Sequence, residues 1–208
     1  MSPIAAFAQG SYDVTDRLKL TAGIRYSWEK KNHVANLSVM GFPVATLPGS
    51  DSWDAFTPKF GLDYKLSEDV FLYASVTRGF KSGGFNSLGN GEQFEPEYIW
   101  SYEAGLKSEW LDRRLLVNIS AFHYDYTNLQ VTRWTQNVTV VENAASAKVW
   151  GGELELTASP VDDLVITSGI SLLDAHYDEY NTENPAFPGL GILDLSGVIH
   201  QVLRLIRP

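Results

Sequence analysis

The chain has no cysteine among its 208 residues. Disulfides, thiolate metal sites and cysteine nucleophiles are therefore excluded, and the absence is merely permissive of an oxidising compartment. Basic residues are also scarce, because 16 lysines and arginines stand against 25 acidic residues and give a formal net charge of −9. Since binding to phosphate backbones requires a basic patch, this composition argues against a nucleic-acid partner.

Long hydrophobic runs are missing as well. The longest, Leu164–Leu173, covers about ten residues and includes polar side chains, which excludes a transmembrane helix. Residues 1–10 lack the basic segment and the small-residue cleavage pattern of a signal peptide. We therefore expect that an exported protein beginning here is incomplete.

Aromatic residues, by contrast, make up 12% of the chain, and turn-forming residues punctuate it often, which favours strands joined by turns. Apolar and polar residues alternate over Leu18–Trp28, Phe56–Tyr64 and Tyr98–Leu106, with Ile99 as the one exception. Similar patterns predict five further strands at Ile4–Asp13, Val70–Arg78, Leu115 to about Val131, Ala147–Ala158 and Leu164 to about Tyr177. The sequence thus predicts an all-β fold, an up-and-down meander of about eight antiparallel strands.

One predicted strand changes its pattern part of the way along. In the strand that begins at Leu115, the apolar positions switch parity between Ala121 and Phe122. This switch predicts either a bulge or a change of surroundings near a rim.

The predicted connections alternate in length. Tight turns are predicted at Val14–Arg17, Leu66–Asp69, Leu111–Arg114 and Ser159–Asp163, and long loops at Ala35–Ser52, Phe80–Pro96 and Thr132–Ser146. Outer-membrane barrels have this asymmetry, with short periplasmic turns and longer extracellular loops. Strand alternation alone does not separate such a barrel from a soluble β-sandwich, and it would favour the sandwich.

The placement of aromatic residues on the apolar face distinguishes the two. Ten residues separate Trp100 from Trp110, which is about 23 Å along the membrane normal for a strand tilted by roughly 45°, close to an apolar band of about 25 Å. Aromatic residues toward the long loops are Tyr26, Trp28, Phe56, Tyr98, Trp100 and Trp150, and those toward the tight turns are Tyr64 and Trp110. These positions indicate two interfacial girdles and therefore the strands of a transmembrane β-barrel.

The opposite face carries the charges of these strands. A lysine or arginine that faces lipid at the midplane would cost about 2–4 kcal/mol, and the apolar parity has none through the central stretches. We predict that the charged residues line an aqueous or plug-filled lumen, whereas in a sandwich they would be a solvated outer face: Lys19, Arg25, Lys59, Asp63, Glu103, Lys107, Glu153 and Glu155.

The chain also resembles a known family. Leu72–Asn86, which reads LYASVTRGFKSGGFN, is similar to a strand and loop that recur in TonB-dependent receptors, and further matches follow in order at Phe94–Glu97, Tyr102–Lys107, Ala121–Tyr126, Asn143–Ala144 and Gly151–Glu155. The resemblance covers roughly Phe7–Tyr180. It implies a cell outer-membrane location and a 22-stranded barrel plugged by an N-terminal domain, of which this chain holds part.

The resemblance implies a function for the intact receptor, not for this chain alone. The receptor would bind a ligand outside the cell and pass it inward when an inner-membrane TonB complex pulls on the plug domain. Its implied partners are outer-membrane lipid, the plug, the TonB complex and a small ligand such as a siderophore, with no cofactor. An iron–siderophore complex is the default cargo, and vitamin B12, other metals and glycans stay open. The alternative is a soluble β-sandwich that binds a ligand or glycan.

The chain divides near residue 180 in this interpretation. Residues 1–180 are a partial outer-membrane barrel, and residues 181–208 are a loop and a tail outside the family pattern. In Val198–Arg207 the apolar residues have helical spacing instead of strand alternation. We hypothesise a truncation or a shifted reading frame after about Gly197.

Four aromatic residues in the predicted long loops are candidate ligand contacts: Phe80, Phe85, Phe94 and Trp134. The favoured alternative is that they pack the loops against one another or lie at the headgroup level.

No motif supports catalysis or a resident metal. Asp174, His176, Asp178 and Glu179 could ligate a metal but fit a solvated loop better. The glycine-rich stretch 79–84 lacks the order and setting of a phosphate-binding loop. The sequence therefore predicts that the protein is not an enzyme.

Overall fold

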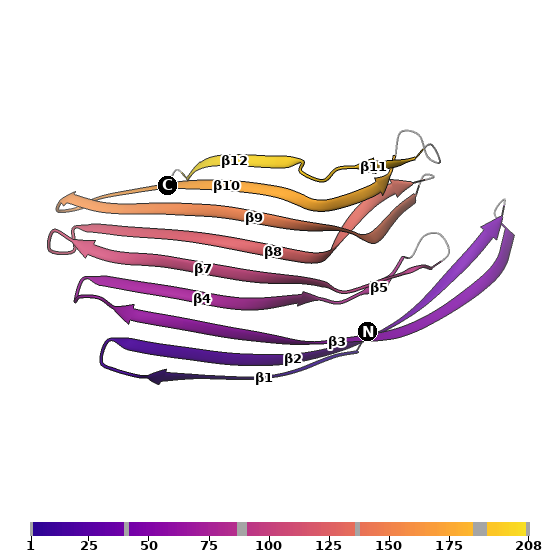
Figure 1. Ribbon diagram of the computed structural model, residues 1–208, viewed down its shortest axis with the longest axis horizontal. Coiled ribbons are helices and arrows are strands. Elements are labelled where there is room, and N and C mark those ends of the chain that lie inside the picture. The colour runs from indigo at the N-terminus through magenta and orange to yellow at the C-terminus, as the bar shows by residue number, and fades with distance from the viewer. Residues whose placement is uncertain (1, 40–41, 87–90, 136–137, 185–190, 207–208) are drawn as a thin grey trace.

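The computed structural model describes residues 2–39, 42–86, 91–135, 138–184 and 191–206. Ten strands within these ranges form one antiparallel sheet, and two short ones form a separate hairpin (Figure 1). The strands are β1 (Ser2–Asp13), β2 (Leu18–Val39), β3 (Phe42–Lys65), β4 (Val70–Lys81), β5 (Gly84–Phe85), β6 (Gln93–Phe94), β7 (Glu97–Trp110), β8 (Leu115–Thr135), β9 (Val138–Val161), β10 (Leu164–Glu183), β11 (Ile192–Asp194) and β12 (Ile199–Ile206).

The eight predicted strands are confirmed as β1, β2, β3, β4, β7, β8, β9 and β10, each hydrogen-bonded to the next in this order. The described residues form one main sheet, and the other sheet, β5–β6, has only two residues per strand and is too small to be the second layer of a sandwich, so the β-sandwich alternative is wrong. No helix in the described part of the chain is long and apolar enough to cross a membrane.

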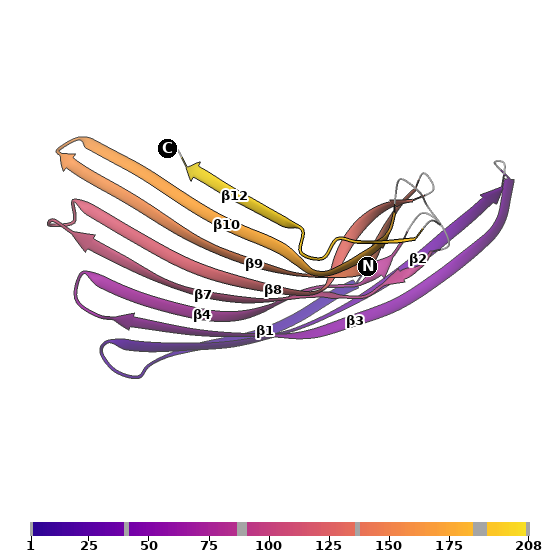
Figure 2. The same cartoon turned by 45° about the horizontal axis from the view of Figure 1, so that its top comes forward.

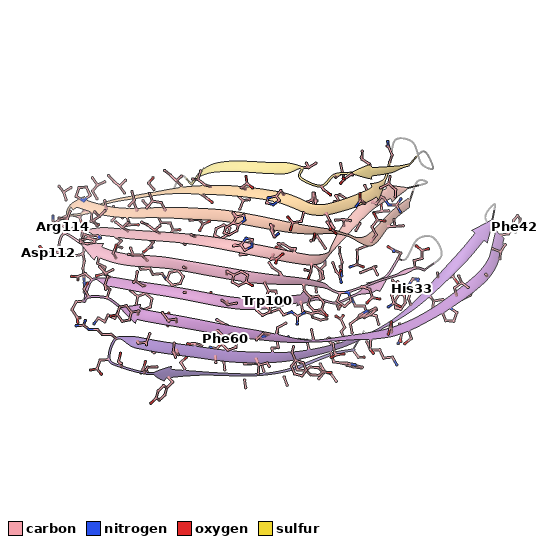
Figure 3. The ribbon with its side chains drawn as sticks, viewed as in Figure 1. His33, Phe42, Phe60, Trp100, Asp112 and Arg114 are labelled. Carbon is pink, nitrogen blue, oxygen red and sulfur yellow. The ribbon has the colours of Figure 1, made fainter. Side chains whose placement is uncertain are left out.

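Tight turns gather at one end of the sheet, as predicted (Figure 1). In the turn Leu111–Arg114, Leu111, Asp112 and Arg113 all have positive φ angles of 56°, 55° and 66°. Left-handed conformations are costly for L-amino acids, so the β7–β8 pairing on either side must hold this turn in place. Figure 3 shows Asp112 and Arg114 at this end, and Phe42 at the far end of the molecule.

Two of the three predicted long loops are wrong, because the strands continue through them. The β2–β3 pairing extends to Val39↔Phe42, and the β8–β9 pairing extends to Thr135↔Val138. The resulting β2–β3 arm reaches well beyond the other hairpins (Figure 2). Only Phe80–Pro96 retains a loop, and even there β4 continues to Lys81 and the β5–β6 hairpin interrupts it.

Prolines explain why the sequence pattern did not predict strands in the β2–β3 arm. Pro43 and Pro48 both lie within β3, paired with Ser38 and Val34. A proline removes one ladder donor, which is tolerated on an edge strand. Since β3 pairs β4 only over Lys59–Lys65, the outer part of β3 has an edge with no described neighbour, and the prolines are accommodated there.

The helical spacing of apolar residues in Val198–Arg207 does not correspond to a helix, because the strand β12 occupies Ile199–Ile206. Residues of β12 pair antiparallel with β10, from Gly169↔Ile206 to His176↔Ile199. Backbone groups at a sheet edge can extend a ladder whatever the side-chain pattern, which explains why alternation did not indicate it. The division of the chain near residue 180 and the shift of reading frame stay predictions.

The parity switch in β8 does not mark a bulge at that point. The β8–β9 register runs unbroken from Leu115↔Ala158 to Tyr126↔Ala147. The register shifts lie farther out, between Tyr126 and Gln130, where Asn128 has a φ of 53°. The switch at Phe122 is therefore a change of surroundings, which was the other predicted explanation.

The register gives the sheet two chemically different faces. We call the face that bears Phe60, Val76, Tyr102, His123 and Trp150, which are cross-strand neighbours, the apolar face. The other, the charged face, bears all the residues predicted to line a lumen: Lys19, Arg25, Lys59, Asp63, Glu103, Lys107, Glu153 and Glu155.

The apolar face leaves large hydrophobic side chains uncovered along much of its length. Exposed fractions reach 50% for Ile24, 56% for Phe60, 49% for Ile119 and 55% for Trp150. Such a continuous patch is unstable in water and marks a surface that another apolar phase covers.

Candidate functional site

Aromatic side chains form a band across the apolar face. Trp100 lies 6.4 Å from Tyr102, Tyr102 lies 5.9 Å from His123, and His123 lies 3.8 Å from Trp150, between ring centroids. These rings belong to three adjacent strands, β7, β8 and β9. We call them the aromatic band, and its place on the apolar face agrees with the predicted girdle at the long-loop side.

On the charged face, aromatic rings lie over glycines. A Cβ at Gly105 would come within 2.6 Å of the Tyr73 ring, and one at Gly151 would overlap the Phe122 ring. The Tyr73 hydroxyl donates to Glu103 Oε1 at 2.9 Å. This packing gives the parity switch its physical reason, because Phe122 covers a glycine of β9 and needs no lipid contact.

A segment at the outer end of the charged face connects two distant parts of the sheet. We call this segment, residues 82–86 and 91–96, the strap. Lys31 Nζ of β2 donates to Ser82 Oγ and to Gly83 O, both at 2.7 Å. Ser82 in turn donates to Glu29 Oε2 at 2.5 Å. These bonds attach the start of the strap to β2.

Phe85 attaches the strap to the β2–β3 arm through ring contacts. It stacks on His33 with 5.6 Å between centroids and meets Trp53 edge-on at 5.8 Å. Trp53 is 5% exposed, so this contact belongs to the small buried part of the molecule. Gly83 is required here, since a Cβ would come within 2.5 Å of the Trp53 indole nitrogen.

The other side of the strap is attached to β8 and β9. Asn86 exchanges two hydrogen bonds with the backbone of Val141, and Asn143 exchanges two with the backbone of Glu95. Gln130 Nε2 donates to the carbonyls of Ser82 and Glu95, both at 3.0 Å. The strap therefore connects β2 and β3 to the outer parts of β8 and β9.

Next to the strap, the charged face contains a cavity of about 390 Å³. Its polar lining residues are Lys81, Glu97, Tyr126, Gln130, His176 and Tyr177. Its apolar lining residues are Leu129, Ala147, Val149 and Ala175. Lys81 Nζ lies 3.5 Å from Glu97 Oε2, and the Lys81 side chain is 60% exposed while Glu97 is 14% exposed. Glu97 also accepts a bond from Gln130 N at 2.9 Å, so the carboxylate is fixed and the ammonium group is accessible.

A larger cavity of about 760 Å³ exists, but its chemistry differs. It lies over small residues of the apolar face, among them Ala74, Ala104, Ala121 and Gly152. Size alone would favour it as a ligand site. We favour the smaller cavity because it combines an accessible cation, two phenols and an amide, the polar groups that orient a small ligand.

The predicted ligand contacts divide among different surroundings. Phe85 and Phe94 come together on β5 and β6, where the Phe94 ring covers Gly84. Phe80 lies on the apolar face, 5.6 Å from Tyr98. Trp134 lies in β8, and its side chain is outside those that the structure describes. Sequence reasoning did not select Lys81 and Glu97 as ligand contacts, although both lie within segments that it singled out, Leu72–Asn86 and Phe94–Glu97.

Acidic residues and a histidine of β10 lie close together, and one of the carboxylates pairs with Lys148 of β9. His176 lies 3.4 Å from Asp174 and 3.5 Å from Asp178, and Lys148 Nζ lies 2.6 Å from Asp178. Within the described ranges, no group of three or more such side chains is arranged to hold a metal ion.

A single-layered antiparallel meander, apolar and girdled by aromatics on one face and charged on the other, defines a segment of an outer-membrane β-barrel. The chain belongs to the family described as TonB dependent receptor-like, beta-barrel, whose profile matches residues 2–197. Barrels of this family reside in the outer membrane. The family consists of receptors, not enzymes.

Known relatives agree with this membership. The chain is 31% identical over 121 residues to the metal-pseudopaline receptor CntO of Pseudomonas aeruginosa, which covers 58% of this chain and 17% of the relative. It is 25% identical over 156 residues to the pesticin receptor of Yersinia pestis, which covers 73% of this chain and 23% of the relative. The chain thus spans about a fifth of the length of these curated relatives.

Solved structures share the fold. The ferric yersiniabactin uptake receptor FyuA from Yersinia pestis matches with a TM-score of 0.75 and 17% identity, over 98% of this chain and 37% of that one. The siderophore receptor PiuA from Acinetobacter baumannii matches with a TM-score of 0.72 and 20% identity, over 93% of this chain and 28% of that one. At these identities the likeness concerns the fold.

Proposed function

We propose that this chain is part of a TonB-dependent outer-membrane receptor that takes up a scarce nutrient by energy-coupled transport, with an iron–siderophore complex as the default cargo. The family match over residues 2–197 carries this proposal. Relatives named for metal-pseudopaline and ferric pyoverdine, and the structures named for siderophore uptake, support a chelated metal as cargo.

The two faces of the sheet suit two different partners in the complete barrel. Outer-membrane lipid covers the apolar face, and the charged face lines the lumen, opposite a plug domain. Basic residues concentrate on β2 and β3, where Arg25 and Lys59 lie, and acidic residues on β7 and β9, where Glu103, Glu153 and Glu155 lie. A plug that fits this wall would present acidic groups to the first region and basic groups to the second.

The cavity beside the strap is the proposed contact with cargo. Its accessible Lys81 ammonium attracts an anionic group such as the carboxylate, phenolate or hydroxamate of a ferric chelate. Tyr126 and Tyr177 add phenol rings and hydroxyl donors. Phe85 and Phe94 hold the strap in position, so their contribution to binding is indirect.

Ligand binding to the complete receptor that carries this segment tests the proposal. The receptor, in detergent, is titrated with a panel of ferric siderophores, and growth under iron limitation reports uptake. We expect Lys81→Gln to weaken binding of the recognised complex roughly tenfold, the effect of one charge-assisted hydrogen bond. Lys65→Gln, at a tight turn, is the matched control and should bind normally.

Two results would count against this function. Binding of no ferric complex together with tight binding of a glycan would move the cargo to another class. An unchanged affinity in both Lys81→Gln and the Tyr126→Phe, Tyr177→Phe double variant would remove the cavity from the ligand site while leaving the transport function open.

A further inference from the structure

Arg78 is a cation on the apolar face. It lies in β4 directly opposite Trp100 of β7, at the level of the aromatic band. Phe80, two residues farther along the same face, pairs with Tyr98. An arginine on a barrel's lipid face is costly at the midplane of the membrane but costs little near the interface. The membrane therefore tolerates Arg78 at this level, but this does not explain the arrangement of the side chains around it.

Two neighbours fix the orientation of the Arg78 guanidinium. Its Cζ lies 4.3 Å from the centroid of the Tyr98 ring, a cation–π contact. Its Nη1 donates to the carbonyl of Phe56 at 3.4 Å, which is long for a hydrogen bond. Its Nε is buried and has no hydrogen-bond partner in the part of the chain that the structure describes. A guanidinium has five N–H donors, and among the described residues only Nη1 has an acceptor.

Among the described residues, no carboxylate lies within ion-pair distance of Arg78. Lys148, the other cation close to the aromatic band on this face, differs because Asp178 lies 2.6 Å away. A partly buried arginine that has no anionic partner in the protein can bind an anion from outside it. The planar guanidinium group matches the oxygens of a phosphate.

We propose that Arg78 binds the phosphate of an outer-membrane lipid headgroup at the level of the aromatic band. Trp100 and Tyr98 flank the bound headgroup, and the apolar residues of the adjacent strands contact its chains. The site rests on the membrane location of the barrel and not on the identity of the cargo. A phosphate in solution presents the same oxygens, so the experiment separates the two sources.

The test uses the complete receptor in phosphatidylcholine vesicles that contain a minor fraction of brominated phosphatidic acid. Bromine quenches nearby tryptophans, and Trp100 lies on the strand next to Arg78. Quenching curves against brominated phosphatidylcholine give the preference for the phosphomonoester. We expect Arg78→Gln to reduce this preference about tenfold, because the variant loses a charged hydrogen bond to the phosphate.

The control is Arg25→Gln, which removes the same charge from the charged face and should keep the wild-type preference. An equal preference in wild type and Arg78→Gln would overturn the proposal. Loss of the wild-type preference on adding millimolar inorganic phosphate would show a site for free phosphate and overturn the lipid assignment. If Arg78→Gln loses the heat-modifiable mobility of a folded barrel, the test is made with Arg78→Lys instead. Lysine keeps the charge but not the planar guanidinium. A reduced preference for phosphatidic acid in this variant supports the proposal, and an unchanged preference overturns it.

Discussion

Asn86 and Val141, 55 positions apart in the sequence, exchange two hydrogen bonds: Asn86 Nδ2 donates to Val141 O at 2.9 Å, and Val141 N donates to Asn86 Oδ1 at 2.7 Å. The side-chain amide thus satisfies both polar groups of one residue in β9. Asn86 is only 7% exposed, so water is a poor substitute for either bond.

Replacing this amide should release one side of the strap. We expect Asn86→Ala to expose Val141 N–H and to accelerate its hydrogen–deuterium exchange about tenfold or more, because each buried bond lost costs about 1–3 kcal/mol. Asn32→Ala is the control, since Asn32 accepts its bond from Ser50 at an exposed position. Unchanged exchange at Val141 would mean that the strap is held by its other contacts.

Gly151 should not tolerate a methyl group. Alanine there would overlap the Phe122 ring, and overpacking of this kind costs about 1–3 kcal/mol. We expect Gly151→Ala to lower the unfolding temperature, which heat-modifiable gel mobility measures. Gly61→Ala is a suitable control because its Cβ would meet the nearest side-chain atom, Thr21 Cβ, at an ordinary 3.5 Å. The double variant Gly151→Ala, Phe122→Leu should recover part of the loss, and its failure to do so would implicate the backbone instead.

The two faces of β3 should differ in solvent access. This segment has no cysteine, so an introduced thiol is the only one within it. In the barrel reconstituted in lipid vesicles, Lys59→Cys should react with a membrane-impermeant maleimide and Phe60→Cys should not. A spin label at the two sites should show the reverse order for collisions with oxygen, which concentrates in lipid. Equal reactivity at both positions would contradict the assignment of lipid and lumen faces.

Strand alternation was sufficient to predict eight strands and both faces, because a period of two is imposed by the pleat itself. It failed beyond the membrane band. There, Pro43 and Pro48 look like turn signals, yet the open edge of β3 accommodates them. Residues in the outer parts of the strands no longer alternate between lipid and water. The alternating pattern that identifies a strand is therefore lost there, although the backbone hydrogen bonds between strands continue.

The candidate site was less predictable for a different reason. The motif that contains Ser82–Asn86 was recognised, but its partners Lys31, Trp53 and Val141 lie on other hairpins. No local pattern links residues so far apart. Phe80 and Phe85, five residues apart, have different surroundings because β4 ends between them and the chain then turns across the charged face.

The tight turn Leu66–Asp69 should give a small acid-dependent effect. Glu68 accepts a hydrogen bond from Lys65 Nζ at 2.7 Å, and this ammonium group lowers the pKa of the Glu68 carboxyl below its ordinary 4.5. A depressed folded-state pKa stabilises the fold above the unfolded-state value and loses this effect as the pH falls through the folded value. Wild type should therefore exceed Glu68→Gln slightly in stability at neutral pH and equal it in acid.

Both groups at this turn are accessible to water, so salt should weaken the effect. Urea unfolding of the two proteins at low and high ionic strength, at neutral pH and at pH values below the ordinary Glu pKa, checks this expectation. A difference that persists in acid would assign the role of Glu68 to something other than its charge.

In the part of the chain that the structure describes, each long strand of the sheet pairs with its neighbours in chain order. Pairing of this kind closes only short loops of chain at every step, so the entropy lost per step is small. The sheet can consequently grow one hairpin at a time from an existing edge, and a partly assembled wall already has its final registers.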